Sequence, residues 1–80
     1  MVTPDMNSTD LDPLRLAYKH AVDEWVDAIR SEEALATPDH SMTAMERWDE
    51  AHFREQDAQK KAAKACEAYK DGLRAVNYGI

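Results

Sequence analysis

Cysteine, glycine and long apolar runs are scarce in this chain of 80 residues, and each scarcity excludes a class of protein. A single cysteine cannot form a disulfide within the chain, which excludes the cross-linked framework of many small secreted domains. Two glycines are too few for a glycine-rich phosphate-binding loop. No run approaches the roughly 18 apolar residues that a membrane-spanning helix requires, and residues 1–5 lack the basic and apolar regions of a signal peptide. We therefore expect a cytoplasmic protein with no membrane partner.

Large apolar side chains are also few. Apolar residues make up 44% of the chain, but thirteen of them are alanines. A chain of this length buries only about 60% of the surface that its unfolded form exposes. We expect one small domain with a thin core that needs support from oligomerisation, since no disulfide is available.

Positive charge is in the minority. The chain has 16 acidic and 10 basic side chains and a formal net charge of -6, which argues against nucleic-acid binding. The basic side chains near the C-terminal end lack an aromatic stacking platform, so we interpret them as solvated flanks of a helix that pair with the acidic first helix. These side chains are Lys60, Lys61, Lys64, Lys70 and Arg74.

Residues 1–11 show no apolar period and are expected to form a flexible tail that precedes the helical domain at residues 12–80. Asp12-Pro13 is a helix-start signal, so the first helix is predicted over about residues 13–36. One apolar face is formed by residues spaced three and four apart: Leu14, Tyr18, Ala21, Trp25, Ala28 and Glu32. Val22, Val26 and Ile29 make this face broader than one partner helix would cover.

A second helix is predicted over about residues 43–77, after a break at Thr37-Pro38 and with a capping box at Thr43 and Glu46. Its seam follows the spacing of a coiled coil for nearly five heptads: Ala44, Trp48, Ala51, Glu55, Ala58, Ala62, Ala65, Tyr69, Gly72 and Val76. One flank of this seam carries Met45, His52, Gln59, Cys66 and Leu73.

The fold class is therefore predicted to be all-α, an antiparallel two-helix hairpin. If the chain reverses about residue 39, Trp48 meets Ile29 and Leu14 lies level with residues 62–65. The remaining stretch of the second helix then overhangs the first by about 20 Å. Either Met6 and Leu11 or a second chain would cover it. We expect a second copy, giving a homodimeric four-helix bundle.

Several side chains are candidates for interaction surfaces. Glu55 interrupts an apolar seam. Either it is a solvated break, or with Gln56 and Gln59 it forms a polar layer that fixes register and partner choice, and we favour the second interpretation. Phe53 faces away from the seam and is a contact within the dimer, a docking point for another protein, or an exposed aromatic residue without a role. Cys66 is interpreted as a small apolar residue beside the seam rather than a reactive thiol, with a disulfide across the dimer as the alternative. The full set of candidate interaction residues is Trp25, Trp48, Phe53, Glu55, Gln59, Tyr69, Leu73 and Val76.

Two histidine and carboxylate pairs have helical spacing, His20 with Glu24 and Asp49 with His52. Such pairs bind metals in some four-helix bundles, but solvated surface groups are the simpler reading, so we assign no metal and no cofactor. The sequence has no nucleophile elbow and no paired buried acids, and we expect no enzyme activity. The predicted function is that of a small acidic adaptor or regulatory protein that self-associates and acts through protein contacts. The alternative is a metal-binding bundle.

Overall fold

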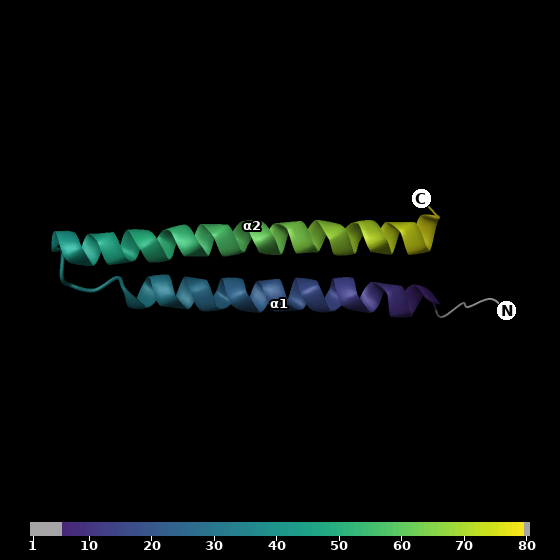
Figure 1. Ribbon diagram of the computed structural model, residues 1–80, viewed down its shortest axis with the longest axis horizontal. Coiled ribbons are helices and arrows are strands. Elements are labelled where there is room, and N and C mark those ends of the chain that lie inside the picture. The colour runs from purple at the N-terminus through teal and green to yellow at the C-terminus, as the bar shows by residue number, and fades with distance from the viewer. Residues whose placement is uncertain (1–5, 80) are drawn as a thin grey trace.

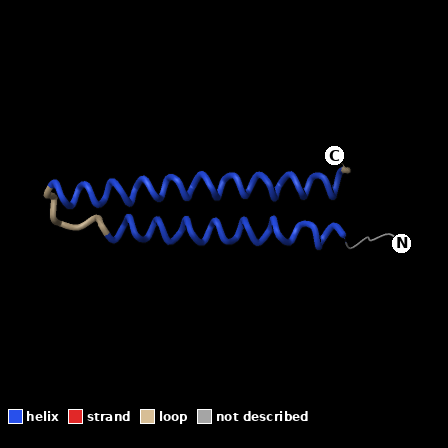
Figure 2. Tube along the Cα trace, in the orientation of Figure 1, coloured by secondary structure: helices blue, strands red, loops and turns tan. Residues whose placement is uncertain are grey.

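The chain forms two antiparallel helices, which confirms the predicted all-α hairpin. A computed structural model describes the backbone of residues 6–79 and the side chains of residues 11–79. Helix α1 spans Met6–Ala34 and helix α2 spans Met42–Tyr78. Figures 1 and 2 show them side by side over most of their length, joined by one connection at the end opposite to the termini. The molecule is a rod of 66 × 17 × 12 Å.

Helix α1 begins earlier and ends earlier than the sequence predicts. It starts at Met6 rather than near residue 13, and Pro13 lies inside it. Proline lacks an N–H group, but it removes only one hydrogen bond of the helix ladder, and the backbone before it stays helical. The helix ends at Ala34 because tight turns follow, in which Leu35 N–H donates to Glu32 O and Ala36 N–H to Glu33 O. Flexibility of residues 1–11 stays a prediction, and residues 1–5 lie outside the described residues.

Helix α2 has nearly the predicted bounds, but the predicted cap at Thr43 is wrong. Ser41 is the N-cap, and its hydroxyl oxygen accepts a hydrogen bond from Ala44 N at 3.2 Å. Asp39 fixes Ser41 in turn by accepting from its N–H at 2.9 Å. At the other end, Gly79 adopts a φ of 71°, the left-handed conformation that glycine favours at helix C-termini.

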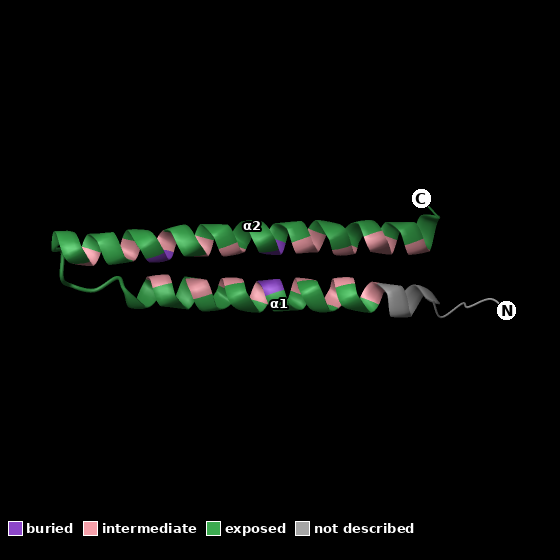
Figure 3. Cartoon of the chain, viewed as in Figure 1, coloured by how far each residue is buried: buried purple, intermediate pink, exposed green. Residues whose placement is uncertain are grey.

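The predicted seam is the interface between the helices. Its residues on α2 are all buried or half-buried, and so are the matching residues of α1. Figure 3 shows these residues on the sides where the two helices face each other. Among the residues whose side chains the structure describes, only Ala21, Ala51 and Ala62 are buried, with 4–9% of their surface exposed. In the described part of the chain, the buried residues are therefore alanines, and the large side chains of the interface are only half-buried.

The predicted overhang of α2 is wrong, because α1 covers the C-terminal part of α2. Tyr18 stacks on Tyr69 with ring centroids 6.1 Å apart. Leu11 and Leu14 lie over Gly72, where an added Cβ would come within 2.7 Å of Leu11 Cδ2 and 3.0 Å of Leu14 Cδ1. Gly72 thus allows the two helices to approach closely.

The register differs from the prediction for a simple reason. Residues 35–41 run onward beyond the end of α1 before the chain reverses, so α2 begins farther along the rod than α1 ends (Figure 1). This shifts every facing pair. Trp48 lies at the connection with Leu35 and Ala36 instead of meeting Ile29.

Candidate functional site

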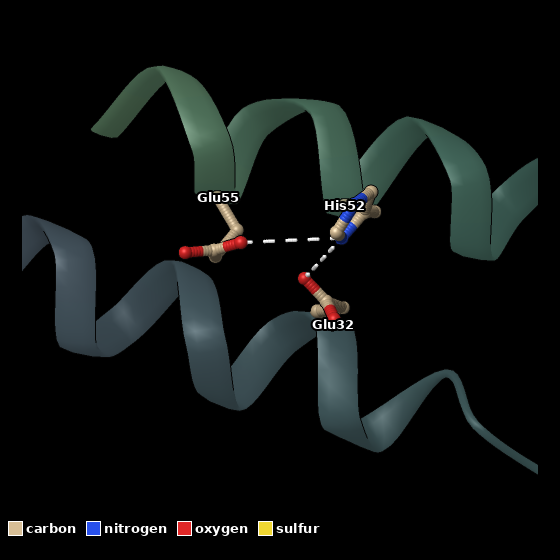
Figure 4. A group of neighbouring side chains, drawn as sticks. All are labelled: Glu32, His52 and Glu55. Atoms are coloured by element: carbon tan, nitrogen blue, oxygen red, sulfur yellow. Dashed lines mark hydrogen bonds and ion pairs between the residues drawn. The ribbon is translucent and has the colours of Figure 1, made fainter. Parts of the chain in front are cut away.

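The most distinctive group of side chains is a cluster of Glu32, His52 and Glu55 in the helix interface. Glu32 comes from α1, and the other two come from successive turns of α2. His52 Nδ1 lies 3.1 Å from Glu32 Oε1 and 3.9 Å from Glu55 Oε1. Figure 4 shows the three side chains directed toward one another in the space between the helices. We call this group the Glu32–His52–Glu55 cluster.

Two tryptophans hold the cluster in place. Trp25 of α1 donates from Nε1 to Glu55 Oε2 at 2.7 Å. The ring of Trp48 stacks on His52, with centroids 5.0 Å apart and planes inclined by 7°. Each tryptophan therefore restricts one member of the cluster, the first by a hydrogen bond to a charged acceptor and the second by contact between ring faces.

The cluster carries more negative than positive charge in a partly desolvated place. The side chains of Glu32, His52 and Glu55 are 22%, 39% and 15% exposed. Two carboxylates face at most one positive charge on the imidazole. The Lys and Arg ion pairs of the described residues all lie within a single helix, as in Arg54–Glu50 and Lys61–Asp57, and none reaches the cluster.

The structure corrects the predicted polar layer. Glu55 does interrupt the seam, but Gln56 and Gln59 are exposed and lie outside the cluster. Its partners are Glu32 and His52. The residue spacing of the first helix predicts Glu32 on its inward-facing side. With the correct register, it would also have predicted that Glu32 lies opposite His52.

The other predicted interaction residues fall into two groups. Trp25, Trp48, Tyr69, Leu73 and Val76 are half-buried, and so are committed in part to the hairpin itself. Phe53 and Gln59 are exposed, Phe53 by 74%.

The two predicted histidine and carboxylate pairs do not form a larger group. His20 Nε2 lies 3.5 Å from Glu24 Oε2, with both side chains more than half exposed. Asp49 is exposed and lies outside the cluster that contains His52. Within residues 11–79, the Glu32–His52–Glu55 cluster is the one group of three potential ligands.

One side of the hairpin is mostly apolar. Five apolar residues each directly follow a small residue of the seam: Val22, Ile29, Met45, Cys66 and Leu73. His52 and Gln59 follow Ala51 and Ala58 and lie on the same side. In an antiparallel pair such positions of the two helices lie on the same side. Viewed from one end of the rod, one chain runs toward the viewer and the other away, so the step from a residue to the next turns in opposite senses in the two helices. We call these five residues the apolar face. Ile29 is 42% and Met45 52% exposed, and the other three are half-buried.

The opposite side is polar. Its positions directly precede seam residues and are exposed. They carry Glu24, Ser31, Arg47, Arg54 and Lys61, together with alanines such as Ala68. The two sides of the rod therefore differ in character.

A hollow lies at the connection between the helices. It has a volume of 410 Å³, and its lining includes Leu35, Ala36, Met45 and Trp48. Met45 belongs to the apolar face, so the hollow continues this face toward the connection.

Comparison with known proteins gives no match to a family model, to a curated protein or to a solved structure. Neither described helix has an apolar stretch sufficient to cross a membrane.

Proposed function

We propose that this protein is a non-enzymatic helical interaction protein that self-associates, two hairpins packing through their apolar faces into a four-helix bundle. Its role is that of an adaptor or regulator that acts through protein contacts. The shared bundle supplies the apolar core that one hairpin lacks.

The exposed area of the single chain is the observation that carries this proposal. The chain exposes 6306 Å², whereas a monomeric globular protein of its mass exposes about 4,900 Å². The excess of about 1,400 Å² is larger than the roughly 800 Å² that each partner buries in a standard interface. The radius of gyration is 18.4 Å, whereas a compact domain of this length has about 12 Å. The elongated shape of the single hairpin accounts for both the large exposed area and the large radius.

The apolar face supports a second copy as the occupant. Burial of Ile29 and Met45 by a two-fold related face would remove water from both at once, since each copy offers the same residues. The elongated outline matches an elongated partner better than a globular one.

Charge favours an arrangement with the connections at opposite ends. Residues 21–62, which form the half near the connection, hold 11 acidic and 5 basic side chains, for a charge of -6. The remaining residues hold 5 of each sign, for a charge of 0. Packing the two acidic halves on each other would be repulsive, whereas packing each against the neutral half avoids this cost.

Sedimentation velocity on the purified chain tests the proposal. We expect a species of twice the 9.1 kDa chain mass at micromolar concentration. The double variant Ile29→Glu, Met45→Glu places charges on the apolar face at two exposed positions, and we expect it to lose the dimer. This loss would appear as monomer mass or as loss of helical circular dichroism at the same concentration.

The double variant Ala68→Glu, Ala75→Glu is the matched control, because it adds the same two charges at exposed positions on the polar side. This variant should keep the dimer mass. A wild-type chain that stays monomeric and melts cooperatively would overturn the proposal, and so would an Ile29→Glu, Met45→Glu variant that keeps the dimer.

A further inference from the structure

We propose that the Glu32–His52–Glu55 cluster is a binding site for a divalent transition-metal ion of the zinc class, with one imidazole and two carboxylate ligands. All three ligands come from one chain, so this inference does not depend on self-association.

The distances within the cluster fit such an ion. Zinc bonds of about 2.0–2.2 Å in a tetrahedral arrangement place neighbouring ligand atoms about 3.3–3.6 Å apart. The two measured separations from His52 Nδ1, 3.1 Å to Glu32 Oε1 and 3.9 Å to Glu55 Oε1, lie on either side of this range. All three ligand atoms lie within 4.8 Å of one another. Side-chain shifts of about 1 Å or less therefore bring the three atoms around one centre.

The surroundings prepare the ligands for binding. Trp25 holds one oxygen of Glu55, Oε2, and leaves Oε1 directed toward His52. Support of this kind by a neighbouring donor is typical of carboxylates that bind metals. Stacking on Trp48 limits rotation of the His52 ring, which lowers the entropy that binding would cost.

The charge of the cluster also favours a cation. If His52 Nδ1 carries a proton, it can donate to Glu32 Oε1, the nearer carboxylate oxygen. Glu55 then accepts a hydrogen bond only at Oε2, from Trp25. A divalent ion would contact both carboxylates together and balance their two charges. The combination of imidazole with carboxylates suits zinc and its neighbours, whereas calcium and magnesium prefer oxygen ligands alone.

Three protein ligands leave a coordination position for water. Structural zinc sites are closed by four protein ligands, and sites with three keep one position open. The proposed site is therefore open, and its exposed edge is at His52.

Isothermal titration of the wild-type chain with ZnCl₂ at pH 7.5 tests the site. We expect one zinc per chain, a melting temperature that rises with zinc concentration, and a visible absorption band when Co²⁺ replaces zinc. Because protons compete with the metal for the ligands, the affinity should fall at pH 5.5. Absence of binding and of the Co²⁺ band in the wild-type chain would overturn the proposal.

Variants locate the site. His52→Ala and Glu55→Gln should each weaken zinc binding at least tenfold, and Glu55→Gln keeps an oxygen that can accept from Trp25. Circular dichroism in the absence of metal should show that both remain helical. His20→Ala removes an exposed histidine and Cys66→Ser removes the thiol, and both should bind as the wild type does. Undiminished binding by His52→Ala, or its loss in either control, would place the metal elsewhere.

Discussion

At the scale of single residues, Glu55 is the exception that needs a physical account. It sits among alanines in a seam where an apolar side chain would bury more area. Its carboxylate is tolerated because Trp25 donates to one oxygen and His52 lies near the other. A buried acceptor without a donor would cost much more than the hydrogen bond itself contributes.

Replacement of Trp25 by Phe tests this account. The change removes the donor and leaves a carboxylate that is 15% exposed, so we expect a loss of about 1–3 kcal/mol in the free energy of unfolding. Urea denaturation measures the loss. In a Glu55→Leu background the same substitution should cost less, because no carboxylate remains to be satisfied. Equal costs in the two backgrounds would show that Trp25 acts only through packing.

Phe53 is the opposite case, a large apolar side chain that the hairpin does not use. Because it is 74% exposed, we expect Phe53→Ala to change the unfolding free energy by less than about 0.5 kcal/mol. It should also leave the molecular mass in solution unchanged. An unfolded or monomeric variant would assign Phe53 to the dimer interface rather than to the free surface.

At the scale of the helices, the seam could be predicted from sequence because many residues share one period. The seam of α2 holds its spacing from Ala44 to Val76, and a single odd residue such as Glu55 does not obscure it. Helix ends depend on one or two residues, and competing signals mislead there. Asp12-Pro13 is typical of a helix start, but Pro13 lies inside α1. Thr43 and Glu46 fit a capping box, but Ser41, two residues earlier, is the N-cap of α2.

The cap of α2 gives a test at two nearby hydroxyl residues. Ser41→Ala removes the oxygen that accepts from Ala44 N and should cost about 1 kcal/mol of unfolding free energy. Thr43 lies within the helix and is exposed, so Thr43→Ala should be neutral or slightly stabilising, since alanine has the higher helix propensity. Chemical denaturation of both variants compares the two. A larger loss for Thr43→Ala would restore the capping box as the start of α2.

The close approach at Gly72 tests the register of the two helices. An added methyl group would meet Leu11, but alanine also favours the helix by about 1 kcal/mol, so we expect Gly72→Ala to have a small net effect. In a Leu11→Ala background the closer contact is gone and only that with Leu14 Cδ1, at 3.0 Å, remains, so Gly72→Ala should be more favourable there than in the wild-type chain, by up to about 1 kcal/mol. Thermal unfolding of the four chains measures the difference. Identical effects of Gly72→Ala with and without Leu11 would contradict the observed register.

At the scale of the whole molecule, the hairpin could be predicted but the Glu32–His52–Glu55 cluster could not. Two periodic helices and a proline-containing break define a hairpin. A cluster that joins both helices depends on the register, which changed when residues 35–41 continued along the rod. Both members on α2 were visible in the sequence, as was Glu32, but their proximity was not.

The thin interface has a consequence for thermal stability. If folding and self-association are linked, a hundredfold increase in chain concentration raises the free energy of unfolding by about 2.7 kcal/mol of dimer. The melting temperature should then rise by roughly 5–10 °C. Circular dichroism melts at two such concentrations measure this shift. A melting temperature that does not depend on concentration would mean that the hairpin is stable alone.

The N-terminal end of α1 and the C-terminal end of α2 lie at the same end of the rod (Figure 1). This placement sets what a tandem fusion of two copies would need. If the copies pack with their connections at the same end, a linker of a few residues suffices. If they pack with the connections at opposite ends, the linker must run the 66 Å length of the rod, which takes about 20 extended residues. The shortest linker that yields a self-contained, concentration-independent bundle would therefore report the relative orientation of the two hairpins.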